Sequence, residues 1–277
     1  MTRRILMALC TTSMLGLPSS AGVVYEIEVK DHGQSPAKTS ETEMAAEGRN
    51  LKMGIAPGQG DGRGEMIFRG DRREMVVVDH DEQSYVVIDE AAIQQLAGQV
   101  SQVADQMAEA LKNVPEDQRA LVEKMMKQRM PARQAPEAPA ADVRRTGERA
   151  DKNGYPCVKY EVLVEGRRIR ELWVTDWGNV EGGDEARDAF REMAEFFSEM
   201  LDAFSDAAGG LGGFGAQDGG IFADMKEIDG FPVVTSGFGG DGSLEDESAL
   251  RSARRQAIDP AEFEPPAGYK RRSMLGQ

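Results

Sequence analysis

Short runs of alternating apolar and polar residues fill the part of the chain before residue 90. From Val24 to Lys30, the residues Tyr25, Ile27 and Val29 fall on one face of an extended chain and charged residues fall on the other, as in a half-buried strand. Similar runs follow, separated by turn-forming residues, and this order predicts an antiparallel meander with short turns. The further strands are expected at 51–55, 65–69, 75–78 and 85–88.

The spacing of apolar residues then lengthens to three and four, which is the period of a helix. Between Ile93 and Leu111 this spacing predicts a helix from about Glu90 to Lys112. Pro115 suits the first turn of a second helix, and Pro131 would end it. We therefore expect a helical hairpin at about 90–131, followed by an Ala- and Pro-rich linker at about 132–143.

The strand pattern returns after the linker, from Arg144 onward. Residues 158–164 alternate, Glu165-Gly166 suits a turn and residues 168–175 return, so a hairpin is predicted. A third helix is expected from Asp184, its cap, to about Ala207, because apolar residues there form one broad side. A Gly-rich loop follows at about 209–220.

The C-terminal part of the chain contains one ambiguous segment. Residues 231–238 predict a strand. The segment 243–258 has a helical spacing of apolar residues, but its position after a glycine turn favours a strand, which is our interpretation. The tail at 263–269 is expected to be extended, because its paired prolines exclude a helix.

The first 21 residues have the pattern of a cleavable signal peptide. Two arginines precede thirteen uncharged, mostly apolar residues, Ile5 to Leu17, and Ser19-Ser20-Ala21 supplies small residues before the expected cut. A membrane span needs about 20 apolar residues, so we expect no transmembrane segment here or later in the chain. A lipoprotein starting at Cys10 is disfavoured, because its apolar segment would be too short. These features predict a periplasmic protein that begins at Gly22.

Charge and cysteine content narrow the expected partners. The formal net charge of −15 becomes −17 when the two arginines of the signal peptide are removed. Nucleic acids and anionic lipid surfaces repel such a chain, so no nucleic acid partner is expected. Cys157 is the one cysteine after residue 21, which excludes a disulfide within the mature chain. We expect it to be a small, buried apolar residue.

The sequence contains no clear set of catalytic or cofactor-binding residues. Its two histidines, His32 and His80, fall in expected turns, and no nucleophile elbow accompanies them. The acidic segments 79–82 and 241–247 lack the spacing of a calcium loop and are interpreted as polar turns. The Gly-rich loop lacks the Lys-Ser or Lys-Thr pair of a phosphate loop. We therefore predict no enzyme activity, no cofactor and no metal site.

Six pieces of the chain, taken in order, match the pattern of a known family. They are Tyr25-Glu26-Ile27 after the expected signal peptide, Asp79 to Tyr85, Gly154 to Tyr160, Glu171 to Trp177, Gly230 to Val233 and Ile258 to Lys270. With these pieces the chain resembles the family called domain of unknown function 4412 (DUF4412), which is placed in the superfamily of lipoprotein-carrier (LolA-like) folds. The resemblance implies an α+β fold, with a curved antiparallel sheet that forms a half-open barrel and helices that cover its concave side. It implies one domain over 22–277, with the helical hairpin as an insertion, and it offers no known site residues.

Two functions are compatible with these features. The first is binding of an apolar ligand, such as a lipid or an acyl chain, between sheet and helices, because methionine is frequent on the expected strands and helix faces. Ordinary core packing is the favoured explanation of the methionines, and a ligand cavity is the alternative. The second is a protein-interaction module in envelope assembly or stress sensing, with the helical hairpin as its docking face. Candidate ligand contacts are Met53, Phe68, Trp173, Phe190, Met193, Phe197 and Met200.

Overall fold

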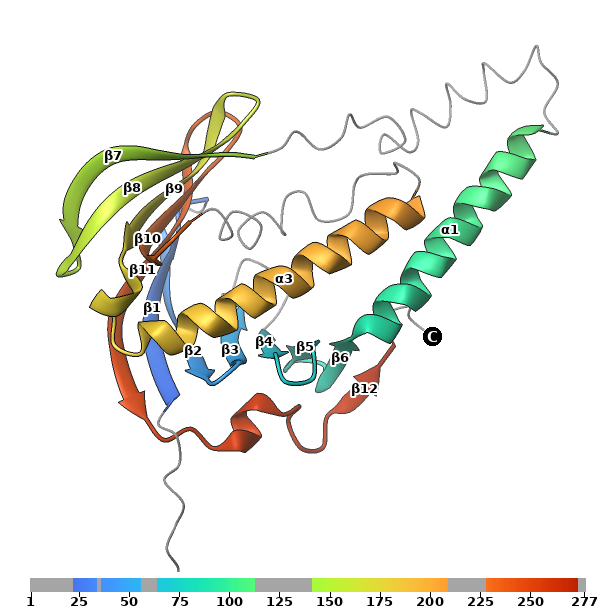
Figure 1. Ribbon diagram of the computed structural model, residues 1–277, viewed down its shortest axis with the longest axis horizontal. Helices are drawn as coiled ribbons and strands as arrows, with labels where there is room; N and C mark the ends of the chain where they lie inside the picture. The colour runs from blue at the N-terminus through green and yellow to red at the C-terminus, as the bar shows by residue number, and fades with distance from the viewer. Residues whose placement is uncertain (1–21, 34–35, 56–63, 113–140, 209–227, 274–277) are drawn as a thin grey trace, which may run out of the picture.

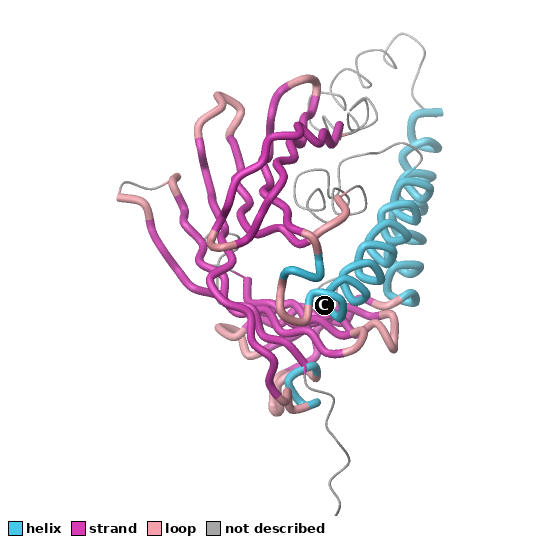
Figure 2. The backbone as a smooth tube through the Cα atoms, turned by 60° about the vertical axis from the view of Figure 1, so that its left-hand side comes forward, coloured by secondary structure: helices cyan, strands magenta, loops and turns pink. Residues whose placement is uncertain are grey.

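The protein is a large, curved and mostly antiparallel sheet with two long helices on its concave side (Figure 1). The computed structural model describes residues 22–33, 36–55, 64–112, 141–208 and 228–273. The tube view shows the same two layers, with strands along one side and the helices along the other (Figure 2). The expected signal peptide, the second arm of the hairpin, most of the linker and the Gly-rich loop lie outside the described residues.

The described secondary structure begins with six strands and a helix and ends with six more strands around a second helix. The first strands are β1 (Gly22–Asp31), β2 (Lys38–Glu47), β3 (Asn50–Ile55), β4 (Gly64–Arg69), β5 (Glu74–Asp79) and β6 (Ser84–Ile88). Helix α1 (Glu90–Lys112) follows, and Asp89 caps it, because its Oδ1 accepts a hydrogen bond from Ala92 N. The remaining strands are β7 (Asp142–Lys152), β8 (Tyr155–Val164), β9 (Arg167–Thr175), β10 (Phe231–Phe238), β11 (Leu244–Gln256) and β12 (Lys270–Arg272). The second long helix is α3 (Gly183–Ala208), and two short 3-10 helices are η2 (Trp177–Asn179) and η3 (Pro260–Phe263).

Two meanders make up the sheet. Its order is β12-β6-β5-β4-β3-β2-β1-β11-β10-β9-β8-β7, so the first meander runs from β1 to β6 and the second from β7 to β11. They join where β1 pairs with β11 in antiparallel register, with Tyr25 opposite Ala253. Strand β12 pairs with β6 in parallel. The sheet is not closed, and the half-open barrel of the expected fold stays a prediction.

Two glycines bring α3 close to the sheet at the point where the helix begins. Gly182 has a φ of +66°, and a side chain there would meet Val23 at 2.6 Å. A Cβ atom at Gly183 would lie 2.0 Å from the carbonyl oxygen of Trp177. The hydroxyl of Tyr25 donates a hydrogen bond to the Gly182 carbonyl, with an O···O distance of 3.0 Å. The start of α3 is therefore fixed against β1.

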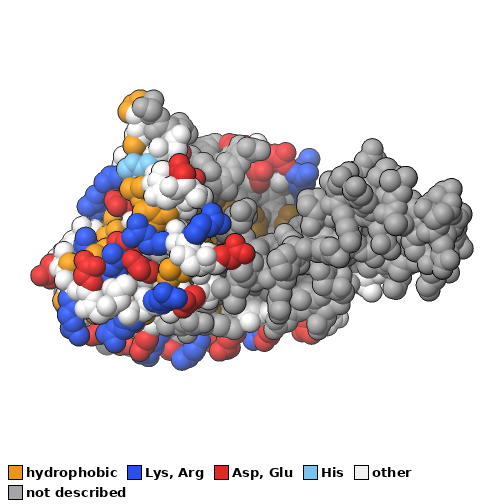
Figure 3. Space-filling view, turned by 90° about the horizontal axis from the view of Figure 1, so that it is seen from above, with side chains coloured by type: hydrophobic (Ala, Val, Ile, Leu, Met, Phe, Trp, Pro, Cys, Tyr) orange, Lys and Arg blue, Asp and Glu red, His pale blue; other side chains and the backbone are white. Residues whose placement is uncertain are grey.

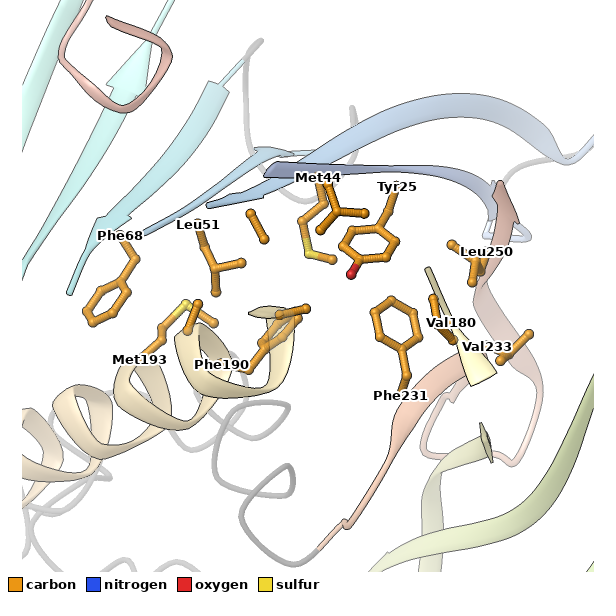
Figure 4. Packing of buried hydrophobic residues seen from close by; sticks show 14 of the residues in the cluster. Tyr25, Met44, Leu51, Phe68, Val180, Phe190, Met193, Phe231, Val233 and Leu250 are labelled. Carbon is orange, nitrogen blue, oxygen red and sulfur yellow. The ribbon is translucent and has the colours of Figure 1, made fainter. Parts of the chain in front are cut away.

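The main hydrophobic core fills the space between α3 and the concave face of the sheet. In Figure 4, Tyr25, Met44, Leu51 and Phe68 point from the sheet toward α3. Phe190 and Met193 of α3 point back at them, and Met193 is fully buried. Burial of a side chain this size contributes about 1.5 to 3 kcal/mol, so this layer holds the helix in place.

A second core covers the convex face of the first meander. Val24, Ile67, Val76, Val78 and Val87 point away from α3 and pack against the C-terminal residues. We call residues 258–272 the C-terminal strap. It contributes the buried side chains of Ile258 and Phe263, and below the sheet it crosses from β11 to the far side of β6 (Figure 1).

Most expected elements are present, and five details differ from the prediction. The first arm of the predicted hairpin is confirmed as α1, and the ambiguous segment is the strand β11. Asp184 lies in the first turn of α3, where its charge suits the helix dipole, and is not the cap. Strand β2 was not predicted, and neither was η3 nor β12. The predicted linker ends earlier than expected, because β7 begins at Asp142.

Candidate functional site

The structure brings all seven candidate ligand contacts into one hydrophobic cluster. Four of them, Phe68, Trp173, Phe190 and Met193, are buried and form part of the packed core. The other three, Met53, Phe197 and Met200, are only partly buried and pack against its edge. The seven side chains therefore differ in how accessible they are to a ligand.

Burial along α3 divides its apolar stripe into two halves. In the first half Ala186, Ala189 and Met193 have no exposed surface, and Phe196 is 3% exposed. Phe197, Met200 and Ala203, in the second half, are half-buried although they continue the same stripe. The helix thus keeps an apolar surface beyond the part of the core that covers it.

The same division is visible across the strands beneath the helix. Leu51, Phe68 and Met75 lie directly opposite one another on β3, β4 and β5, and all three are buried. The next row on the same face consists of Met53, Met66 and Val77, which are again opposite one another but only half-buried. The two rows are two residues apart, or about 7 Å. Coverage of the sheet by packed side chains therefore decreases over one step along the strands.

Two ion pairs connect α3 to the turns at one edge of these strands. Glu192 pairs with Arg49, and Glu199 pairs with Arg73, at the turns that end β2 and β4. Phe190 and Phe197 are two residues earlier, about 200° around the helix, so they lie on the opposite flank. Phe196 lies between these two flanks and contacts Phe68 of the buried row, with ring centroids 5.8 Å apart, so the flank of Phe190 and Phe197 is the one away from the turns.

We define the apolar patch as Met53, Met66, Val77, Phe197 and Met200. Met66 and Val77 were not among the predicted contacts. Their registers with Met53 place them in the same row, and only the strand pairing reveals this. The patch has flexible thioethers from both layers, which adapt readily to an apolar ligand.

Trp173 is part of the cluster but lies at its other end. It is on β9, which is five strands from β3 in the sheet, or roughly 24 Å. Its Nε1 donates a hydrogen bond to Glu171 Oε1 at 3.1 Å, and Lys152 Nζ lies 4.3 Å from the ring centroid. Trp173 therefore marks the boundary between the apolar layer and a charged surface, and it does not contribute to the apolar patch.

The described histidine His80 and the acidic segment 79–82 lie outside this patch. His80 lies at the β5–β6 turn, where its Nδ1 is 2.9 Å from Tyr269 Oη, and Tyr269 packs on the convex core. The acidic segment 79–82 is the polar turn that was expected. Among the described residues, no group of three or more His, Cys, Asp or Glu side chains is arranged to hold a metal ion.

Cys157 is buried at 3% exposure, as predicted, and belongs to the same cluster as α3. Burial raises the pKa of its thiol. The neighbouring Val158, Tyr160 and Val162 point to the other face of the sheet, where Tyr160 and Val162 are buried and Val158 is half-buried. The thiol is therefore an apolar core group.

Positive and negative side chains alternate on the described part of the surface that Figure 3 shows. No single-sign patch of the kind that binds nucleic acid is visible on this part. Within the described residues, neither helix combines the length and the apolar character needed to cross a membrane.

No family model matches the chain, and no curated protein matches it. Solved structures with a distantly similar arrangement include an uncharacterised conserved protein from Thermus thermophilus, with 8% identity and a TM-score of 0.42 over 91% of both chains. The MucA/MucB complex of Pseudomonas aeruginosa aligns over 91% of this chain and 58% of that one, with 11% identity and a TM-score of 0.35. A LolA superfamily protein from Nitrosomonas europaea aligns over 88% of both chains, with 7% identity and a TM-score of 0.24. Membership of the DUF4412 family stays a prediction.

Proposed function

We propose that this chain is a non-catalytic periplasmic protein that binds an apolar ligand, a lipid or an acyl chain, on the apolar patch between α3 and the sheet. The proposal rests on one observation. The stripe of α3 and the inner face of β3–β5 both continue as apolar surface past the point where the core covers them. Such a surface gains free energy when an apolar molecule covers it, by about 0.8 kcal/mol for each methylene group removed from water.

The shape of the patch suits a chain-like ligand. Met53, Met66 and Val77 form a row that crosses three strands, and neighbouring strands are about 4.8 Å apart. Phe197 and Met200 of α3 pack against the same hydrophobic core as this row. A ligand lying along the row would contact the sheet on one side and the helix on the other, which is how apolar sites usually enclose a ligand.

Binding without chemistry is supported by the composition of the patch. Its five side chains carry no titratable group, and His80 lies on the other side of the sheet near Tyr269. The expected signal peptide supports export to the periplasm.

The test is displacement of a fluorescent fatty-acid probe from the purified mature protein. Met200→Glu places a carboxylate in the patch, and we expect it to weaken probe binding by more than about tenfold, because an unpaired charge there must lose water. Met200→Leu keeps the site apolar and similar in size, so it should bind within about threefold of wild type. His80→Ala should leave binding unchanged.

Circular dichroism establishes that each variant is folded. Equal binding by wild type and a folded Met200→Glu would refute the proposal. If wild type binds no probe at all, the protein-interaction module becomes the better explanation of the patch.

A further inference from the structure

A polar pocket lies on the convex side of the sheet, away from the apolar patch. It has a volume of about 450 Å³, within the range of small-molecule sites. The C-terminal strap forms one wall with Pro265, Pro266 and Tyr269, and β6 forms another with Tyr85 and Val87. Because Tyr85, Val87 and Tyr269 belong to or pack on the convex core, the pocket is separated from the apolar patch by the sheet.

Guanidinium groups outnumber carboxylates in the pocket. Its lining includes Arg69, Arg72 and Arg271, against Glu74 and Glu264. Arg69 bridges both carboxylates, with Nη2 lying 2.7 Å from Glu74 and Nη1 bonded to Glu264. Arg72 donates to Glu264 Oε1 at 2.7 Å. Both carboxylates are thus already paired, and one positive charge remains.

Arg271 carries that remaining charge. It lies on β12 opposite Tyr85, and its side chain is exposed. Within the described residues it has no ion-pair partner. The next residue, Arg272, points to the other side of the strand and pairs with Glu82.

A second arginine of the lining, Arg69, has a buried donor without a partner among the described residues. The side chain of Arg69 is only 7% exposed, yet its Nε has no hydrogen-bond partner in the described structure. Buried donors are nearly always paired in folded proteins, and a charged donor left unpaired is especially costly. A pocket with an excess of positive charge and with aromatic and prolyl walls has the chemistry of a site for an organic anion.

We propose that this pocket binds a small organic acid, whose carboxylate pairs with Arg271 at the rim while its aromatic or aliphatic body packs between Tyr85, Tyr269 and the prolines. This site is separate from the apolar patch and does not depend on the function proposed for it. A carboxylate matches the planar, two-pronged geometry of a guanidinium, and the apolar body of the ligand covers the rings of Tyr85 and Tyr269.

Benzoate is the probe, measured by saturation-transfer NMR on the full mature protein. A ligand of this size is expected to bind with a dissociation constant on the order of 1 mM. Benzamide has the same shape without the charge and should bind at least about tenfold more weakly. Arg271→Gln should weaken benzoate binding by about fivefold or more, because it removes the charge but keeps the length of the side chain.

Arg272→Gln is the matched control. It removes the same charge from the adjacent position and breaks only an exposed ion pair, so benzoate binding should stay within about twofold of wild type. The proposal is overturned if wild type gives no saturation transfer at about 20 mM benzoate. It is also overturned if benzamide binds as well as benzoate, or if the two arginine variants lose binding equally.

Discussion

The division of the α3 stripe predicts that two methionines on the same helix contribute very differently to stability. Met193 has no exposed surface and lies at the centre of the main core, so Met193→Ala leaves a cavity. Core substitutions of this type cost about 2 to 5 kcal/mol. Met200 is half-buried, and the truncation to Ala removes roughly three heavy atoms that are partly in water already. At about 0.8 kcal/mol for each fully buried group, Met200→Ala should cost only about 1 kcal/mol.

Urea unfolding measures this difference directly. Trp173 and Trp177 lie in or against the main core, so tryptophan fluorescence follows its loss. The midpoint should fall much further for Met193→Ala than for Met200→Ala, with the same dependence of the unfolding free energy on urea in both. Equal destabilisation of the two variants would show that Met200 is an ordinary core residue, and would remove the basis for the apolar patch.

Three further predictions concern other parts of the fold. Glu165 has a φ of +53° in the β8–β9 turn, a backbone conformation that asparagine adopts more easily than glutamate. Glu165→Asn reproduces the Asn153-Gly154 turn before β8 and should stabilise the protein by about 0.5 kcal/mol in thermal unfolding. No gain in stability would contradict the inferred strain. Cys157 should react with a thiol reagent at pH 8 far more slowly in the native protein than in urea, because burial both shields it and raises its pKa; equal rates would show an exposed thiol. Hydrogen bonds from Arg72, together with the charges of Arg69 and Arg72, lower the pKa of Glu264 in the folded protein. The ionised Glu264 carboxylate therefore stabilises the fold at pH values above its pKa in the unfolded chain, and this stabilisation is lost as the pH falls through its pKa in the folded protein. Because Glu264 is partly exposed and water screens its ion pairs, Glu264→Gln should be less stable than wild type by no more than about 1 kcal/mol at pH 7. A difference in stability that does not shrink in acid would exclude this cause.

Segments in which apolar residues recur at a regular spacing were predictable from the sequence, and segments without such a pattern were not. The helix α1 and the β8–β9 hairpin follow directly from apolar spacing and turn residues. Strand β2 was missed because its sequence, KTSETEMAAE, is mostly polar or small. Only Met44 and Ala46 of this strand are buried, and pairing with β1 and β3 on both sides makes it a strand.

The C-terminal strap was missed for a related reason. The run Met75-Val76-Val77-Val78 is apolar at every position, which indicates burial on both faces but does not say what covers the second face. In the structure Val76 and Val78 pack against Ile258 and Phe263 of the strap. The paired prolines correctly predicted an extended chain, but its contacts depend on residues about 180 positions away, which local patterns cannot encode.

The candidate site was predictable in part. The apolar side of α3 and the inward alternation of β3 brought Met53, Phe197 and Met200 into the predicted set, and all three lie on the apolar patch. The sequence could not separate them from Phe68 and Met193, because burial depends on how far α3 reaches across the strands. Met66 and Val77 join the patch through register, which requires knowledge of which strands pair.

The most direct test of ligand binding is mass spectrometry of the organic extract of protein purified from a bacterial periplasm. The apolar patch predicts an acyl-containing species that is retained by wild type and Met200→Leu and is strongly reduced in folded Met200→Glu. A wild-type extract with no more of any such species than that of Met200→Glu would contradict the proposal that this protein carries an apolar ligand between α3 and its sheet.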